Sequence, residues 1–308
     1  MADVIIIGAG PAGLSAAIYV QRAGKTALVL EAMTYGGQII NTPEVENYPG
    51  IQCISGFEFA TALYQQATGL GAEVVFERAE KIEEDADTGK KKVITSGGKT
   101  YTAGAVILAT GAKNRHLGID REEELTGFGV SYCATCDGAF FKGKPVAVNG
   151  GGNTALEDAL FLAGYCSKIY LIHRREGFRG EPAVLEKLRQ KENVEFVLNA
   201  TVTELVGEPK LKGVVVTDKN TGEDRELQVD GLFIAIGQTP ENKDFENVAE
   251  LDPAGYIIAG EDCLTKTPGI FTAGDCRTKT VRQLTTAASD GAIAALAACS
   301  YLDTAGNH

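Results

Sequence analysis

The clearest pattern near the start of the chain is a short apolar run followed by closely spaced glycines. The run Val4–Ile7 is apolar at every position, which is typical of a parallel strand buried on both faces. It leads into Gly-x-Gly-x-x-Gly, and small apolar residues from Ala12 onward predict a helix. A second apolar run, Ala27–Leu30, ends at Glu31 and predicts the next strand. This order of strand, glycine turn, helix and strand predicts a βαβ unit.

The same order of elements recurs in the middle of the chain. An apolar run at Pro145–Val148 leads into Gly-x-Gly-x-x-Ala, then into a helical pattern over residues 156–163 and a strand at Lys168–Ile172. Alternating β-rich segments come next in both halves, at residues 92–102 and 214–229. Each half then closes on an apolar run that ends in glycine: Ala105–Gly111 and Leu232–Gly237. The pattern therefore predicts a duplicated fold.

The last part of the chain predicts one more strand and a long helix. The segment Gly269–Asp275 is a short strand that ends in an acid, and an alanine-rich helix runs from Arg282 through Ala298. An acid at a strand end can bind polyol hydroxyls, and a helix N-terminus can stabilise negative charge. We expect this tail to return to the first domain. The alternative for Asp275 is a helix cap or turn residue.

Length and composition fit two globular domains. The chain has 308 residues, 44% of them hydrophobic and 23% charged, which is typical of a folded protein. Its net charge of -12 argues against nucleic-acid binding. The uncharged stretch from Val4 to Val20 is short for a membrane span, is broken by Pro11, and has no Lys or Arg before it. We expect a cytoplasmic protein with neither a membrane nor a nucleic-acid partner.

The glycines of the first segment suit a dinucleotide site. Gly8 allows the tight turn, Gly10 lets the backbone approach a pyrophosphate, and Gly13 lets the helix pack on the strand. The helix N-terminus favours the negative charge of the phosphates. Glu31 stands where a ribose hydroxyl would be held. The segment therefore predicts a dinucleotide site rather than a structural turn.

At the position that corresponds to Glu31, the second unit carries four basic residues: His173, Arg174, Arg175 and Arg179. Arginines at the end of the second strand accommodate a 2'-phosphate, which a carboxylate would repel. The predicted ligand is thus NADPH rather than NADH. The alternative is a solvated surface cluster, but the position of so much positive charge in an acidic chain favours the nucleotide.

A Cys-x-x-Cys segment lies just before the second glycine segment, at Cys133 and Cys136. Two thiols at this spacing can close a small ring, and a nearby helix N-terminus can lower a thiol pKa enough for exchange. Half of a structural zinc site is the alternative, but the sequence has no second Cys-x-x-Cys or His-x-x-His after it. We predict a redox-active pair and no metal. The remaining cysteines are single, and we assign them no role: Cys53, Cys166, Cys263, Cys276 and Cys299.

Taken in order, these motifs closely resemble those of the low-molecular-weight, bacterial-type thioredoxin reductases, class II pyridine nucleotide-disulfide oxidoreductases. The resemblance runs from Asp3 to Leu302. Eight segments carry it: Gly8–Gly13, Gly36–Gln38, Glu46–Gly50, Ala109–Ala112, Cys133–Gly138, Gly150–Ala155, His173–Arg179 and Ala273–Asp275.

The resemblance implies an α/β fold with two Rossmann-like, three-layer ββα dinucleotide-binding domains, the second inserted into the first. An FAD domain would comprise residues 1–112 and 241–308. An NADPH domain carrying the cysteine pair would comprise residues 113–240. A homodimer is also implied.

The resemblance also assigns binding residues. Those implied around FAD lie in the first glycine segment, in the loops after it and in the tail: Gly8, Gly10, Pro11, Ala12, Gly13, Glu31, Gly37, Gln38, Asn47, Ala79, Thr110, Gly111, Asp275, Arg282, Gln283 and Leu284. Those implied around NADPH lie in the second unit: Gly150, Gly152, Asn153, Thr154, His173, Arg174, Arg175, Arg179, Ile236 and Gly237.

The implied activity is that of an NADPH-dependent thioredoxin reductase. Reducing equivalents would pass from NADPH through FAD to the Cys133–Cys136 disulfide, and then to the disulfide of thioredoxin or a thioredoxin-like or glutaredoxin-like protein. By resemblance, Cys136 faces the flavin and Cys133 attacks the substrate, although residue chemistry alone leaves their order open. Asp137 would act as acid and base for the pair. Its alternative is a turn residue before Gly138.

The order of motifs has a mechanical consequence. The disulfide and the nicotinamide site belong to the same inserted domain, yet each must in turn lie against the flavin. We therefore expect the inserted domain to rotate about the two crossings between domains, near residues 113–118 and 238–242.

Two alternatives remain open. One is a related flavin disulfide reductase with a different redoxin partner. The other is a non-catalytic NADPH-binding sensor that uses the thiols as a redox switch, which would gain nothing from a full flavin site.

Overall fold

The computed structural model describes residues 2–85 and 88–305, which fall into two compact units. Unit 1 comprises the described residues up to Lys113 and from Thr239 onward, and unit 2 is Asn114–Gln238. These boundaries differ from the expected ones by one residue at the first crossing and by two at the second. The two crossing segments, β8 (Ala112–Asn114) and β17 (Gln238–Pro240), pair with each other as a two-stranded sheet.

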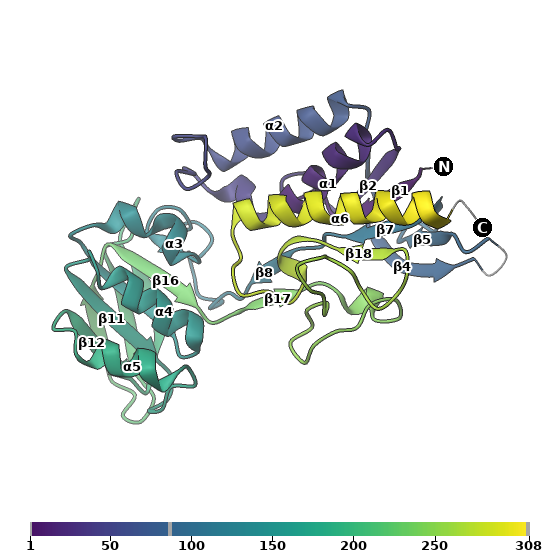
Figure 1. Cartoon of the computed structure of the whole chain (residues 1–308). Helices are drawn as coiled ribbons and strands as arrows, with labels where there is room; N and C mark the ends of the chain where they lie inside the picture. Colours follow the sequence, from purple (N-terminus) through teal and green to yellow (C-terminus); the bar gives the residue numbers. More distant parts are fainter. Residues whose placement is uncertain (1, 86–87, 306–308) are drawn as a thin grey trace. The chain divides into compact units, whose positions relative to one another are not determined.

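Unit 1 is built on a parallel sheet of order β18-β7-β1-β2-β3. Its strands are β1 (Val4–Ile7), β2 (Ala27–Glu31), β3 (Glu73–Phe76), β7 (Ala105–Leu108) and β18 (Ile270–Thr272). Helices lie on one face (Figure 1): α1 (Pro11–Arg22), α2 (Gly56–Gly69) and α6 (Leu284–Ala305). An antiparallel sheet lies on the other: β4 (Ala79–Glu84), β5 (Lys91–Thr95) and β6 (Thr100–Ala103). Short 3-10 turns complete the unit: η1 (Gly37–Asn41), η3 (Lys243–Phe245) and η4 (Gly274–Cys276).

The uniformly apolar first strand is explained by this three-layer arrangement. Val4 and Ile6 pack into the core on the helix side, whereas Ile5 and Ile7 pack into the core on the side of the antiparallel sheet. All four side chains are buried, so a polar residue at any of them would lie unpaired in a core.

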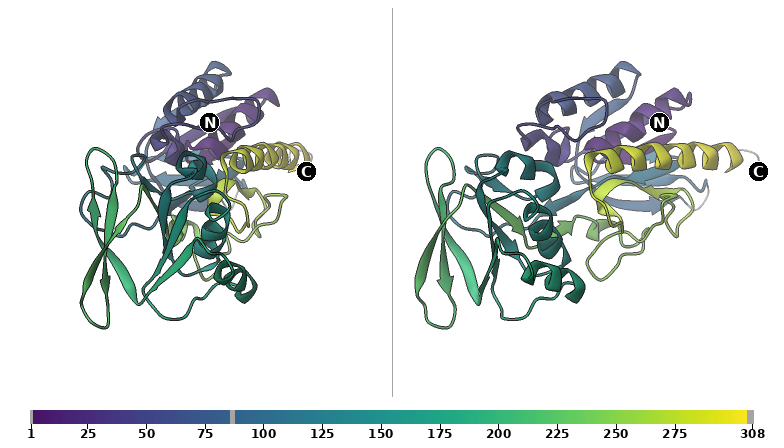
Figure 2. Two further views of the ribbon diagram at one scale, coloured as in Figure 1. Left: turned by 90° about the vertical axis from the view of Figure 1, so that its left-hand side faces the viewer. Right: turned by 60° about the vertical axis from the view of Figure 1, so that its left-hand side comes forward.

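Unit 2 repeats the plan with a parallel sheet of order β12-β11-β10-β16-β9. Its strands are β9 (Val130–Ser131), β10 (Pro145–Gly150), β11 (Lys168–His173), β12 (Val194–Leu198) and β16 (Gly231–Ala235). Figure 2 shows helices on one side of this sheet and the antiparallel sheet on the other. The helical segments are α3 (Ala134–Asp137), η2 (Gly138–Phe141), α4 (Asn153–Leu162) and α5 (Pro182–Arg189). The antiparallel strands are β13 (Ala200–Val206), β14 (Gly213–Asp218) and β15 (Asp224–Gln228). The predicted α/β fold class, two three-layer dinucleotide-binding folds, is confirmed.

The two units agree in detail at their glycine loops. A Cβ atom on Gly8 would lie 2.3 Å from the carbonyl oxygen of Ala109, and one on Gly150 would lie 2.3 Å from that of Ala235. In each unit the loop therefore presses its backbone against the end of the neighbouring strand, β7 or β16, which leaves no room for a side chain.

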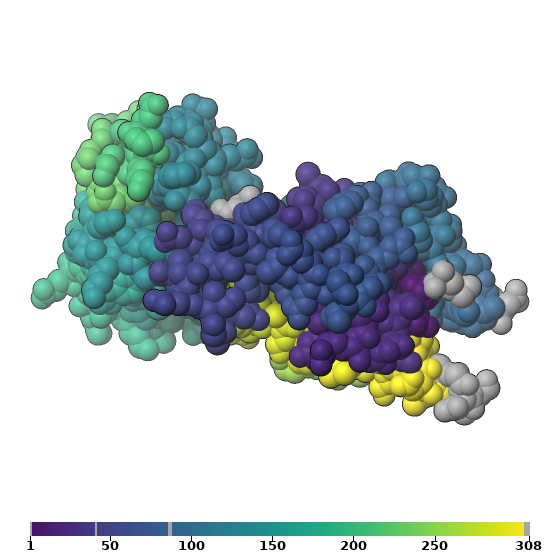
Figure 3. Space-filling view, turned by 90° about the horizontal axis from the view of Figure 1, so that it is seen from above, coloured from purple at the N-terminus to yellow at the C-terminus, as the bar shows by residue number. Residues whose placement is uncertain are grey.

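The C-terminal helix differs from its predicted extent. It begins at Leu284 rather than Arg282 and continues to Ala305 instead of ending at Ala298. No glycine or proline occurs between Ala298 and Ala305, and Tyr301 and Leu302 pack against the helix-side core, which extends the helix. Figure 3 shows α6 lying along the N-terminal segment of the chain on one face of unit 1.

The contact between α1 and α6 depends on one helical glycine. A Cβ atom on Gly291 would lie 2.1 Å from the carbonyl oxygen of Ala12. We expect Gly291→Ala to lower the free energy of unfolding by about 1–3 kcal/mol, because backbone atoms must move apart. Gly69→Ala, at the open end of α2, is the control and should be neutral or stabilise by up to about 1 kcal/mol. Urea unfolding of both variants distinguishes the two effects, and equal midpoints would contradict the packing argument.

Candidate active site

The redox pair lies at the carboxyl end of β9 in unit 2. Cys133 and Cys136 form a disulfide with their Cα atoms 5.3 Å apart. Cys133 is the residue before the first turn of α3, and both cysteines are partly exposed. The predicted pair is therefore present as a bond at the surface of its unit, where exchange chemistry requires it.

Asp137 closes the same short helix. The backbone N–H of Asp137 donates to the carbonyl of Cys133 at 3.1 Å, and its carboxylate accepts a hydrogen bond from the Ser131 hydroxyl at 2.6 Å. Burial raises the pKa of Asp137 above its ordinary value, while the bond from Ser131 lowers it. A carboxyl with a raised pKa next to a disulfide suits proton transfer to and from sulfur.

The other five cysteines, all within the described part of the chain, are free thiols. Burial raises the pKa of Cys166 to about 11 and that of Cys263 to about 12. It also raises the pKa of Cys299. Thiols held in their protonated form are poor nucleophiles, which agrees with assigning these cysteines no role.

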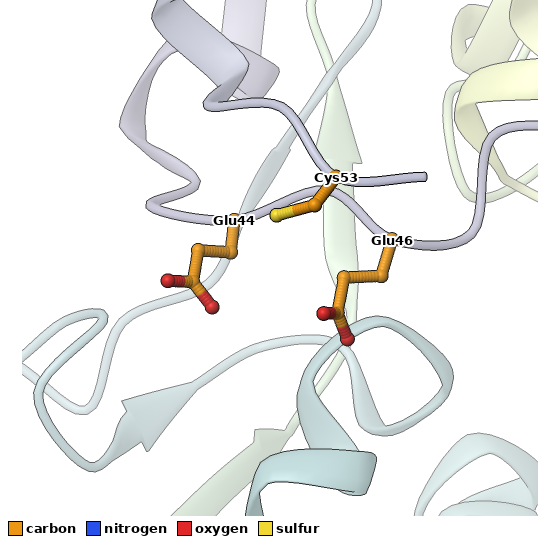
Figure 4. A group of neighbouring side chains, drawn as sticks. All are labelled: Glu44, Glu46 and Cys53. Atoms are coloured by element: carbon orange, nitrogen blue, oxygen red, sulfur yellow. The ribbon is translucent and has the colours of Figure 1, made fainter. Parts of the chain in front are cut away.

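Cys53 is exposed but lies among acidic side chains. Figure 4 shows it beside Glu44 and Glu46, and the possible ligand atoms of the three residues lie within 4.8 Å of one another. Val45 and Ile54 pair across the two segments that carry them. Partial desolvation and the carboxylates of Glu44, Glu46 and Glu58 raise the pKa of the Cys53 thiol. Exposed acidic groups of this kind are ordinary surface features, so we assign no metal site here.

In unit 1, four of the residues expected around FAD line one pocket of about 100 Å³: Gly8, Glu31, Ala79 and Thr110. Glu31 is held in place by two backbone groups, since its carboxylate accepts from the N–H of Ala9 at 2.8 Å and of Met33 at 2.9 Å. A carboxylate can accept further hydrogen bonds, so it still fits a ribose hydroxyl.

The Gly36–Gln38 segment lies close to the first glycine loop. A Cβ atom on Gly37 would lie 3.2 Å from the Cα atom of Gly10, so a ligand could approach bare backbone from both loops. Gln38 donates to the carbonyl of Ala112, next to Gly111, whose φ is 68°. Pro11, Ala12 and Gly13 form the first turn of α1.

The tail brings further predicted residues into unit 1. Asp275 lies in η4, and its Oδ1 atom is buried without a hydrogen-bond partner among the residues that the structure describes. Burial raises the pKa of this carboxyl. A buried acceptor without a donor is the observation that best fits a ligand hydroxyl at this point.

The residues before α6 surround the same turn. Arg282 lies over the Tyr256 ring at 4.3 Å and donates to the carbonyl of Arg277 at 3.3 Å. Asn47 donates to Gln283 at 3.3 Å, which joins two residues far apart in sequence. Leu284 is the first residue of α6.

Several of the residues expected around NADPH lie on or next to the second glycine loop. Arg179 donates its backbone N–H to the carbonyl of Gly151 at 2.8 Å, and Asn153 accepts from the N–H of Glu181 at 2.8 Å. A Cβ atom on Gly152 would meet nothing within 4 Å, so this side of the loop is open. Thr154 lies in the exposed first turn of α4, and Ile236 and Gly237 come directly after β16.

The basic cluster divides into two kinds of residue. Arg174, Arg175 and Arg179 are exposed and available to a phosphate. His173 is only 5% exposed, and a Cβ atom on Gly151 would lie 2.1 Å from its ring. Burial lowers the pKa of His173, so its ring supports the loop as a neutral group while the arginines carry the charge. Direct contact of His173 with NADPH stays a prediction.

Comparison with known proteins identifies the family. The family model described as pyridine nucleotide-disulphide oxidoreductase matches residues 2–291. The chain belongs to this family. It is 44% identical to a thioredoxin reductase of Listeria monocytogenes over 98% of this chain and 94% of the relative. It is 45% identical to one of Treponema pallidum over 99% of this chain and 98% of the relative.

A solved structure agrees with these relatives. Thioredoxin reductase from Streptococcus pyogenes is 38% identical and superimposes with a TM-score of 0.94, covering 99% of both chains. The resemblance to low-molecular-weight thioredoxin reductases that the motifs predicted is confirmed.

The structure of this oxidoreductase adds residues that sequence reasoning missed. Asn242 is fully buried, accepts from the Thr110 hydroxyl at 2.7 Å, and donates to the carbonyls of Gly255 and Cys276. It thereby links Thr110 to the turn that carries Asp275. No local signal marks a single asparagine for this role, because its three partners come from three separate segments.

A second missed group is a buried ion pair under the same turn. Asp290 of α6 accepts from Arg277 at 2.8 and 2.9 Å, from Lys279 at 2.9 Å and from the N–H of Gly274 at 2.9 Å. Arg277 is 1% exposed and Asp290 3%. Burial alone would raise the pKa of Asp290, but its cationic partners hold it below the ordinary value. The pair fixes the turn that presents Asp275 against α6.

We expect Asp290→Asn to destabilise the protein by about 3–5 kcal/mol at neutral pH, because it removes the buried charge that pairs with Arg277 and Lys279 and leaves Arg277 with the exposed Glu261 as its ion-pair partner. A carboxyl group whose pKa is lowered by folding stabilises the fold at pH values above its pKa in the unfolded chain. The difference in stability between Asp290→Asn and wild type should therefore persist down to about pH 5. Below about pH 5 it should shrink progressively, as pH falls past the ordinary pKa of 3.8 toward the lower pKa of Asp290 in the folded protein. The control, Glu83→Gln, removes an exposed pair with Lys81 and should cost less than about 1 kcal/mol. Equal effects of the two variants in urea unfolding would refute this role.

Proposed function

We propose that this oxidoreductase is a thioredoxin reductase that carries reducing equivalents from NADPH through FAD and the Cys133–Cys136 disulfide to thioredoxin. The observation that carries the proposal is the position of the disulfide. It comes directly after β9 in the unit that also holds the second glycine loop and the exposed arginines. Full-length relatives named thioredoxin reductase support the same activity.

FAD fits unit 1, where the buried Oδ1 atom of Asp275 would accept a hydroxyl hydrogen bond and Glu31 would hold the ribose. The bare backbone of Gly10 and Gly37 would face the pyrophosphate at the N-terminus of α1. Bound FAD supplies two-electron chemistry between a nicotinamide and a disulfide. NADPH fits unit 2, where the glycine loop would approach the pyrophosphate and Arg174, Arg175 and Arg179 the 2'-phosphate.

The reduced cysteine pair then works by thiol-disulfide exchange. Cys133 gives its proton to Asp137, and the resulting thiolate attacks one sulfur of the thioredoxin disulfide, which breaks that bond and forms a mixed disulfide. Cys136 then loses its thiol proton and attacks the Cys133 sulfur, which breaks the mixed disulfide and releases the thioredoxin sulfur that Cys133 had attacked. Two electrons pass to thioredoxin, its two sulfurs take up two protons, and the Cys133–Cys136 bond re-forms.

We propose that unit 2 rotates between the two half-reactions about the paired crossing strands β8 and β17. The expected hinge at residues 113–118 ends in a fixed segment, because Glu122 accepts from the N–H groups of Leu117 and Gly118 at 2.9 and 2.8 Å. The turning residues would therefore lie before Leu117.

The remaining assignments stay predictions. These are the identity of the redoxin, a homodimer and a cytoplasmic location. Within residues 2–85 and 88–305, no helix combines the length and apolar character needed to cross a bilayer.

The activity is tested with cysteine variants. We expect wild-type protein to reduce thioredoxin with NADPH. Cys133→Ser and Cys136→Ser should lose this reaction while NADPH still bleaches the flavin, because only the final electron acceptor within the chain is removed. Cys53→Ser, which changes an exposed thiol, should keep full activity. The proposal fails if the purified protein holds no FAD, or if a variant that lacks both Cys133 and Cys136 turns over thioredoxin at the wild-type rate.

The choice of nucleotide is tested at the arginines. Replacing any one of Arg174, Arg175 and Arg179 with glutamine should raise the KM for NADPH about tenfold or more, since a charge-assisted bond to a phosphate contributes about 1.5–3 kcal/mol. The KM for NADH should change little. Arg189→Gln, an exposed arginine of α5 that pairs with Glu186, is the matched control. Equal increases for NADPH and NADH would contradict recognition of the 2'-phosphate.

A further inference from the structure

The hydroxyl of Ser131 lies between the two residues whose chemistry it would affect. It donates to Asp137 Oδ2 at 2.6 Å and accepts from the backbone N–H of Cys133 at 3.1 Å. Ser131 is the last residue of β9 and only 4% exposed, so water does not compete freely for these bonds.

The position of Ser131 in the sheet fixes this geometry. Its strand pairs with β16 through Val130 opposite Leu232 and Ser131 opposite Phe233. The next helix, α3, starts only three residues later and has no side-chain cap of its own at Cys133. The Ser131 hydroxyl therefore takes up the N–H of Cys133 and holds the far end of the same helical turn through Asp137.

We propose that Ser131 is a positioning residue for the exchange reaction, which sets the orientation and proton affinity of the Asp137 carboxyl beside Cys133. The inference rests on the proposed role of Asp137 as the proton acceptor of Cys133. The donated bond stabilises the carboxylate, so the group can accept a thiol proton although it is buried.

Among the groups near Asp137, the Ser131 hydroxyl is the one that lowers the pKa of the Asp137 carboxyl against the effect of burial. In this oxidised state Cys133, which precedes α3, and Cys136 within α3 are bonded to each other and carry no charge, and in the reduced protein they are the thiols whose protons the test follows. On α4, which packs against α3, the titratable groups are Glu157 and Asp158, and Tyr165 lies beyond its end with its hydroxyl near Gly138. Asp158 has a pKa raised to about 7, chiefly by burial and then by Glu157. Only burial and Ser131 shift the pKa of Asp137.

Tyr132, the neighbour of Ser131, provides a matched control. Its hydroxyl donates to Glu122 at 2.7 Å and lies 2.9 Å from His116, and it makes no described hydrogen bond to Asp137. Tyr132→Phe therefore removes a hydroxyl from the same segment without touching the proposed contact.

The test measures oxidation of the pre-reduced full-length protein by a small aromatic disulfide as a function of pH, in single turnover. In wild type the rate falls as pH drops through the pKa of Asp137, because the carboxylate form accepts the Cys133 proton. Loss of the Ser131 donor raises that pKa, so Ser131→Ala should move the acid limb upward by about one pH unit. At pH values below the acid limb, Ser131→Ala should react about tenfold more slowly than wild type. Above the limb, the two rates should agree. Tyr132→Phe should leave the limb in place.

Two further variants separate positioning from folding. Ser131→Thr keeps the hydroxyl and should restore the wild-type limb. In an Asp137→Asn background, Ser131→Ala should have no further effect on the pH profile. A uniform loss of rate at every pH, or an undiminished shift in the Asp137→Asn background, would overturn the inference. If wild type reacts with the aromatic disulfide but not with thioredoxin, the proposed function fails while the role of Ser131 is still measured.

Discussion

The contact on which both units depend is the close approach of a glycine to the end of a neighbouring strand. At Gly8 and at Gly150, any side chain would collide with a backbone carbonyl, that of Ala109 or Ala235. Because the loop lies so close to the sheet, the next helix starts at the carboxyl edge, where its first backbone N–H groups have no partner within the helix. An anion-binding position thus arises twice from the same steric constraint.

The two units differ in the residues that come after an equivalent edge strand. In unit 1, β18 pairs with β7 and leads to the buried acid Asp275. In unit 2, β9 pairs with β16 and leads to the disulfide. Both segments leave the sheet at its carboxyl edge, where the glycine loops also lie. Duplication therefore supplies two positions of the same geometry, and a few residues after the strand decide whether the position presents a hydrogen-bond acceptor or a redox pair.

Buried polar side chains hold these segments in place. Asn242 and Asp290 fix the turn around Asp275, and Ser131 holds the turn that carries the cysteines. Such groups are costly to bury alone but are fully partnered here, which restricts each turn to one arrangement. A reacting sulfur or a ligand hydroxyl then meets an already ordered partner, so less conformational entropy is lost when it binds or reacts.

The sequence by itself determined the features that depend on contiguous residues. These are the repeated strand, glycine turn and helix, the Cys133–Cys136 pair, the basic residues after β11, and through them the fold class and family. Each is set by local backbone geometry or by close spacing, so the order of residues contains it. Only the tertiary structure decided the length of α6, the buried position of His173 under Gly151, and the bonds of Asn242, Asp290 and Ser131. These depend on which distant segments pack together, and a hydrogen bond between such segments leaves no periodic or spaced signal in the chain.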